Sequence, residues 1–194
     1  MDIAQTITDT AAFDWLVIGF CVLMFVVGFA QGVIRRLLGI ASIAFSFLLA
    51  ANLRSTLGAF LADSWTQFPR EYSYMISFGV MFILFSVIFA IAIQSFYKRT
   101  PILAKWPIVD ELLGGVLGVV EALLIIGCGI AILDSFFRLP IGIGPQQVAQ
   151  IKDLYAAVNA SGTASVFRDT LIPLFVAVTG PLVPSDIQAL FPRP

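Results

Sequence analysis

Charge is scarce in this sequence, and histidine is absent. Charged residues make up 12% of the 194 residues, about half the roughly 25% found in ordinary soluble domains. The lack of histidine removes the commonest metal ligand and the commonest general base near neutral pH. The formal net charge is −1, which argues against a nucleic-acid partner because phosphate binding needs clustered lysine and arginine. We therefore expect no nucleic-acid partner.

Apolar residues take the place of the missing charge, at 59% of the chain. So few charged residues cannot cover that much apolar surface in a water-soluble globule. The apolar residues are concentrated in four stretches: Trp15 to about Ile34, Leu37 to Leu53, Tyr74 to Phe96, and Leu112 to Leu133. About 20 helical residues cross a hydrocarbon layer, and helices leave no backbone polar group unpaired in lipid. The sequence predicts an all-α fold, an integral membrane bundle of four transmembrane helices with the lipid bilayer as its surroundings.

The predicted bundle occupies residues 1–137, and residues 138–194 form a tail. The tail holds seven of the ten prolines. Pro145 is placed to open a short helix that ends near Val158, since proline is tolerated at the first helical position. A second apolar segment runs from Ala164 to Val178, with Pro173 inside it. Because proline disturbs a helix interior, we expect this segment to be an interfacial or re-entrant helix on the bundle rather than a fifth span.

Basic residues gather in two of the connections between the stretches. The first and third loops hold Arg35, Arg36, Lys98, Arg99 and Lys105. In the segment before the first stretch the only charged residues are Asp2, Asp9 and Asp14, and a second loop from Arg54 to Ser73 mixes both signs. The positive-inside rule then predicts cytoplasmic first and third loops, with the N- and C-termini outside.

Glu121 is the single charged residue inside the fourth stretch. Counted along the helix from its two ends, it lies near the middle of the bilayer. A carboxylate there should face the bundle interior, find a partner or be protonated. Gln31, at a comparable depth counted from Asp14, is the expected partner, and Arg35 lies one turn below Gln31. Such a pair is interpreted either as a proton or ion relay or a polar lining for a substrate path, or as a buried hydrogen bond that fixes helix register.

Small residues indicate where the helices meet. Gly28 to Gly32 and Gly114 to Gly118 both read GxxxG, a spacing that lets helix backbones approach closely. A further stripe runs along the second stretch through Gly39, Ser42, Ser46 and Ala50. Cys21 and Cys128 both lie in predicted spans, where we expect small packing residues rather than a disulfide or a metal pair.

Motifs of catalysis and cofactor binding are missing from the sequence. It has no P-loop, no CxxC or HExxH, and no Ser-His-Asp or Cys-His arrangement. Asp110 and Glu111 open the fourth helix, where acids complement the helix dipole, and Asp134 is expected to be a solvated cap at its far end. We therefore expect no enzyme activity, no cofactor and no metal.

Three segments resemble the patterns of one known family. They are Phe13-Asp14-Trp15, Gln31-Gly32-Val33-Ile34-Arg35, and the run from Asp110 through Gly114 and Gly118 to Glu121. They resemble, in order, an aspartate opening the first helix, Arg-Gly-x-x-Arg, and Asp-Arg-x-x-Gly-x-x-x-Gly-x-x-Arg of the colicin V production protein (CvpA) family. Two further segments, Leu133-Asp134-Ser135-Phe136 and Leu171-Ile172-Pro173, are similar to the outer end and tail of the family, so that the resemblance covers about residues 13–175. Asp14, Gly32, Arg35, Asp110, Gly114 and Gly118 match motif positions, whereas Gln31 and Glu121 stand where the family usually has arginine.

The resemblance implies a multi-pass protein of the bacterial inner membrane with four spans. It implies an accessory or scaffold role in the production or export of colicin V-type toxins, or in an envelope function on which that export depends. The expected partners are other membrane proteins or further copies of the chain. The alternative is a small oligomeric transporter or channel, with Glu121 and Gln31 in a polar path.

Overall fold

Four long helices form the body of the protein. The computed structural model describes residues 12–65, 70–96, 107–137 and 149–190. The long helices are α2 (Ala12–Gln31), α3 (Val33–Ser64), α4 (Arg70–Phe96) and α5 (Pro107–Phe137), and each contains an apolar window long enough to cross a membrane. Helices and turns make up the described residues, which contain no strand. The predicted all-α membrane bundle with four spans is confirmed.

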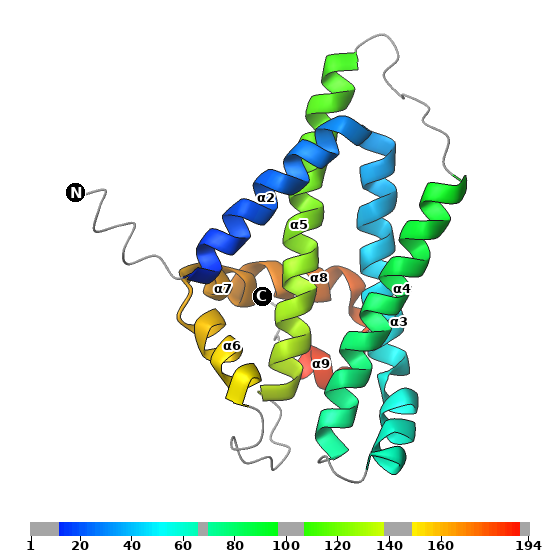
Figure 1. Cartoon of the computed structure of the whole chain (residues 1–194), viewed down its shortest axis with the longest axis vertical. Helices are drawn as coiled ribbons and strands as arrows, with labels where there is room; N and C mark the ends of the chain where they lie inside the picture. Colours follow the sequence, from blue (N-terminus) through cyan, green and yellow to red (C-terminus); the bar gives the residue numbers. More distant parts are fainter. Residues whose placement is uncertain (1–11, 66–69, 97–106, 138–148, 191–194) are drawn as a thin grey trace, which may run out of the picture.

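The tail folds into short helices that lie on the bundle. They are α6 (Ala149–Asn159), α7 (Gly162–Val166), a wide π-helical turn (Phe167–Leu171), α8 (Ile172–Thr179), a 3₁₀ turn (Gly180–Leu182) and α9 (Ser185–Leu190). Figure 1 shows α7 and α8 lying across the direction of the long helices. The π-helical turn ends two residues before Pro173, which has no N–H to continue a regular ladder. Pro145, the predicted start of the first tail helix, lies outside the described residues.

Glycines bring α2 and α5 into close contact. Figure 1 shows α2 slanting across α5. A Cβ atom built on Gly114 would lie 2.6 Å from the carbonyl oxygen of Gly28 and 2.9 Å from the Cα of Gly32. Gly118 packs in the same way against the backbone of Met24. The two GxxxG segments therefore face each other, and backbone meets backbone where any side chain would intrude.

A single residue separates α2 from α3. Gly32 has φ 78°, a left-handed conformation that glycine adopts without steric cost. Because α3 begins at once, Arg35 and Arg36 lie in its first turn rather than in a loop, which corrects the expected first connection. The helix also continues to Ser64, so Arg54 is helical and the second connection is shorter than expected. Asp2, Asp9, Lys98, Arg99 and Lys105 lie outside the described residues.

Phe47 of α3 joins the bundle and the tail in one core. Its ring lies 5.4 Å from that of Phe78 in α4 and 5.6 Å from that of Phe175 in α8. Ser46 and Ala50, from the predicted small stripe, are fully buried beside it. Buried tail residues that include Phe167, Ile172, Val176 and Ile187 belong to the same apolar cluster as the long helices. The tail is therefore part of the packed core.

The faces of the long helices that point away from the core remain apolar. Ile83, Val87 and Ile91 follow one face of α4 and are exposed. In water such a surface would be unfavourable, whereas in a bilayer it meets hydrocarbon. These exposed faces agree with four helices that cross the membrane.

We predict that Gly114→Ala destabilises the protein by about 1–3 kcal/mol, as overpacking does in other cores. The added methyl would meet the backbone of α2, which cannot turn aside as a flexible side chain can. Gly129→Ala in the same helix is the matched control, because nothing lies within 4 Å of its Cβ position. The measurement is the free energy of unfolding in mixed detergent micelles. Equal stability of both variants would contradict the close α2–α5 contact.

Candidate functional site

A buried ion pair joins α3 to the middle of α5. Arg36 donates from Nη1 to Oε2 of Glu121, and the two residues are 4% and 9% exposed. Gly39 lies directly beside the carboxylate, since a Cβ built there would be 2.5 Å from Oε1 of Glu121. The absent side chain leaves the space that the carboxylate fills. The partner of Glu121 is thus Arg36, and the expected pairing with Gln31 is wrong.

The crossing of α2 over α5 explains why Gln31 is out of reach. Gly32 packs beside Gly114, and Glu121 lies seven residues beyond Gly114, or roughly 10 Å along α5. Depth counted along each helix from its own end ignores the slant of α2 that Figure 1 shows. Because α3 starts at the contact point and runs in the same direction as α5, Arg36 is carried toward Glu121.

Asp110 lies at the end of the bundle where α2 turns into α3, close to Gly32. Its carboxylate is close to the Cα of Gly32, because a Cβ built there would lie 2.5 Å from Oδ2. The residue is 6% exposed, and Oδ1 has no hydrogen-bond partner among the described groups. It stands in the first turn of α5 and beside the first turn of α3. The positive ends of two helix dipoles therefore stabilise its negative charge.

Asp14 ties the start of α2 to the tail. Its Oδ1 accepts hydrogen bonds from the hydroxyl of Ser161 and from the backbone N–H of Thr163, the latter at 3.1 Å. The Ser161 hydroxyl in turn accepts from the backbone N–H of Ala164 at 3.2 Å and caps α7. Asp14 thereby holds the first turn of α7 against the bundle.

Asp134 ties the far end of α5 to the tail. It is fully buried and accepts two hydrogen bonds from Arg168, at 2.8 Å from Nε and 2.7 Å from Nη2. The Arg168 guanidinium also lies 5.7 Å from the ring of Tyr155, which stacks on Phe137 with centroids 4.2 Å apart. The expected solvated cap is therefore wrong, because the tail folds back and covers this carboxylate.

The guanidinium of Arg168 stays protonated in this setting. Burial by itself lowers its pKa, but the hydrogen bonds and the charge of Asp134 outweigh burial and leave the pKa above its ordinary value. The stabilisation is complete below the ordinary arginine pKa, which lies far above neutral pH, and is lost only at still higher pH. The tie is therefore permanent across physiological pH.

The remaining predicted residues lie apart from these pairs or serve helix packing. Gln31 and Arg35 are half-buried at the turn between α2 and α3. Cys21 and Cys128 are free thiols, and Cys21 packs against the apolar core that contains Cys128. Within the described ranges, no three acidic or cysteine side chains gather as a metal site would require.

A comparison with known families gives one match. A family described as colicin V production protein matches residues 13–165. This chain belongs to the colicin V production protein family. No curated protein and no solved structure matches it. The matched region includes both members of the Arg36–Glu121 pair, Asp14 and Asp134, whereas Arg168 lies just beyond it. This family is not a known enzyme family.

Sequence reasoning missed Arg36, Ser161 and Arg168 as partners. A lone acid in a span does indicate a nearby cation. Arg35 and Arg36 stand four and three residues before Gly39, so both lie on the same side of the helix as Gly39, and the sequence does not show which of the two pairs with Glu121. The tail partners depend on how the chain returns to the bundle after a connection outside the described residues. Local sequence carries no signal for that return.

We predict that Glu121→Leu lowers stability by about 3–5 kcal/mol, because it leaves the buried Arg36 charge unpaired. The double variant Arg36→Met/Glu121→Leu should recover most of this loss, since an apolar pair replaces an ionic one. The measurement is a double-mutant cycle on the free energy of unfolding. Additive effects of the two single changes would show that the residues do not interact.

We predict that Asp134→Asn loosens the tail. Amide hydrogen exchange across α7 and α8 should become several-fold faster, because a neutral amide holds the Arg168 guanidinium less tightly than a carboxylate. Asp153→Asn, on the exposed face of α6, is the matched control and should leave exchange unchanged. In the wild-type protein, protection of the tail should not fall between about pH 7 and 10, below the pKa range of arginine. Loss of protection in that window would contradict the Arg168 tie.

Proposed function

We propose that this protein is an accessory or scaffold subunit of the bacterial inner membrane that supports the production or export of colicin V-type toxins. Membership of the colicin V production protein family supports the assignment of the protein to toxin production or export. The use of the buried polar groups supports the accessory role. Arg36–Glu121, Arg168–Asp134 and the Asp14 contacts all connect one helix to another. Side chains that are paired in this way stabilise a framework, and few described polar side chains are left unpaired for transport or catalysis.

A small oligomeric transporter is the second candidate, and one observation favours it. At the end of the bundle where α2 meets α3, Oδ1 of Asp110 and Nε of Arg36 are buried and have no partner among the described groups. A path for protons or ions would use such groups. The path first expected, through Gln31 and Glu121, loses support because the two lie about two helical turns apart along α5.

We further propose that the end with the α2–α3 turn faces the cytoplasm. Arg35 and Arg36 lie at this end, and Asp14 lies at the other, as the positive-inside rule favours. Both termini then lie on the outer side, with α6 beside the outer end of α5 and α8 packed within the membrane against the middle of α5. This placement leaves the tail as a contact surface for a membrane-protein partner of the envelope.

The proposal predicts a loss of toxin export in cells that lack this protein. In a strain that carries a colicin V-type toxin operon, deletion of the gene should lower secreted toxin at least several-fold while the intracellular peptide remains. The wild-type gene should restore export, and Arg36→Met/Glu121→Leu should restore it as well because the framework survives. Undiminished secretion in the deletion strain would contradict the proposed process. Rescue by wild type but not by the well-folded double variant would favour the transporter.

Photo-crosslinking in native membranes then tests the tail as a contact surface. Probes at Leu154 and Leu182, two exposed tail residues, are compared with a probe at Ile83 on the outer face of α4. The tail probes should capture a defined component of the export or envelope machinery, and the α4 probe should not. Self-crosslinks alone from the tail would contradict the accessory role.

A further inference from the structure

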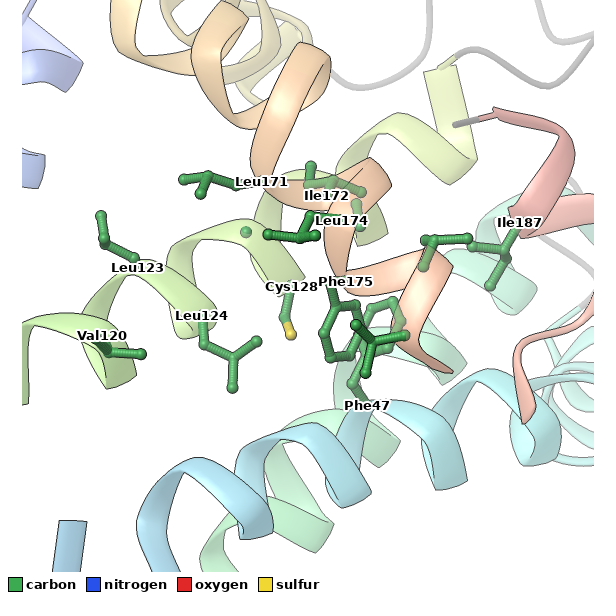
Figure 2. Close-up of a pocket in the computed structure, with 14 residues that line it drawn as sticks. Phe47, Val120, Leu123, Leu124, Cys128, Leu171, Ile172, Leu174, Phe175 and Ile187 are labelled. Carbon is green, nitrogen blue, oxygen red and sulfur yellow. The ribbon is translucent and has the colours of Figure 1, made fainter. Parts of the chain in front are cut away.

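An apolar cavity lies between α5 and the tail helix α8. Its volume is about 370 Å³, within the range of small-molecule sites. Figure 2 shows Leu171 and Leu174 of the tail on one side and Leu123 and Leu124 of α5 on the other, with Phe47 of α3 nearby. No lining residue carries a charged or hydrogen-bonding side chain other than the thiol of Cys128. The proposed function makes no use of this cavity.

Small residues on α5 hollow out one wall. Gly127, Cys128 and Ala131 face the tail helix, whose side chains are larger. A Cβ built on Gly127 would lie 3.5 Å from the ring of Phe167 in the π-helical turn, an ordinary van der Waals distance, so a methyl group would fit at this position. The ion pair between Arg168 and Asp134 holds the tail at this separation.

The rim of the cavity faces the membrane interior. Val120 on α5 and Leu174 and Val178 on α8 line it and are 45%, 56% and 77% exposed. Val120 lies next to Glu121 near the middle of a membrane-spanning helix. From Val120 to Ala131 the cavity follows twelve residues of α5, a rise of about 16 Å. It is an elongated groove that opens toward hydrocarbon.

The chemistry of the groove selects its occupant. Water is held in a cavity only by two or more polar partners, which this lining does not supply. An empty groove would leave its walls without dispersion contacts on one side. A polar or charged ligand would lose its hydration without compensation. The remaining class of occupant is an apolar chain, and the bilayer around the rim supplies the acyl chains of its lipids.

We propose that this groove binds one acyl chain of a membrane phospholipid, inserted lengthwise between α5 and α8. The chain touches protein on both sides, whereas a lipid against the outer face of α4 touches protein on one side only. It is therefore held longer than surrounding lipids. The bound chain fills the space between the bundle and the tail and becomes part of the packing that holds α8 in place.

The test uses the full-length protein in phospholipid nanodiscs that contain a phosphatidylcholine with a photoreactive diazirine in its acyl chain. After irradiation, mass spectrometry maps the lipid adducts. In the wild-type protein, adducts should be several-fold denser on residues 120–131 and 171–178 than on the exposed face of α4 around Ile83. Equal density on both surfaces would overturn the proposal.

Two filling variants test the groove from opposite walls. Val120→Trp and Leu174→Trp each place a large ring at a rim position that is already exposed, and each should reduce groove adducts several-fold without changing those on α4. Ile83→Trp is the matched control and should leave groove adducts unchanged. Retained α4 labelling shows that a variant is folded in the nanodisc. Groove labelling that survives both filling variants would overturn the proposal.

A polypeptide is the competing occupant. Photoreactive amino acids at positions 123 and 174, in cells that make the protein, distinguish the two. Phospholipid adducts of the intact chain support the proposal. A crosslink to a peptide or protein at both positions, without lipid, would overturn it.

Discussion

The contact between α2 and α5 at their glycines determines where the other elements can lie. With Gly28, Gly114 and Gly118 in place, the two backbones meet and α2 ends directly beside the first turns of α5. Gly32 then reverses the chain in one residue, so that α3 starts at the same point. From there α3 runs along α5, and Gly39 leaves the space in which Glu121 meets Arg36. A larger residue at the crossing would separate the helices and with them the ion pair.

The buried polar groups have a consistent use. In hydrocarbon a polar side chain is costly unless a partner satisfies it, and a partner on another helix fixes the relative position of the two. Glu121 with Arg36 fixes α5 against α3, and Asp134 with Arg168 fixes α5 against the tail. Asp14 fixes α2 against the tail through Ser161 and Thr163. The result is a framework whose outer faces remain apolar and meet lipid, as the proposed accessory role requires.

The number and nature of the spans could be predicted from the sequence because both depend on local composition. Four apolar stretches of sufficient length are visible without knowledge of any contact, and two GxxxG segments indicate a close crossing. The partner of Glu121 could not be predicted, since a slanted α2 changes which residues share a depth. The burial of Asp134 could not be predicted either, because it depends on a tail that returns to the bundle 34 residues later.

A flux assay on the reconstituted protein tests the central claim that the polar groups are structural ties and not a conduction path. Proteoliposomes with a pH gradient and a membrane potential report proton and cation movement. A framework of paired groups predicts flux no greater than in empty liposomes, for the wild-type protein and for Glu121→Gln alike. Flux in the wild-type protein that Glu121→Gln abolishes, while the variant remains folded, would contradict the claim and establish a transporter.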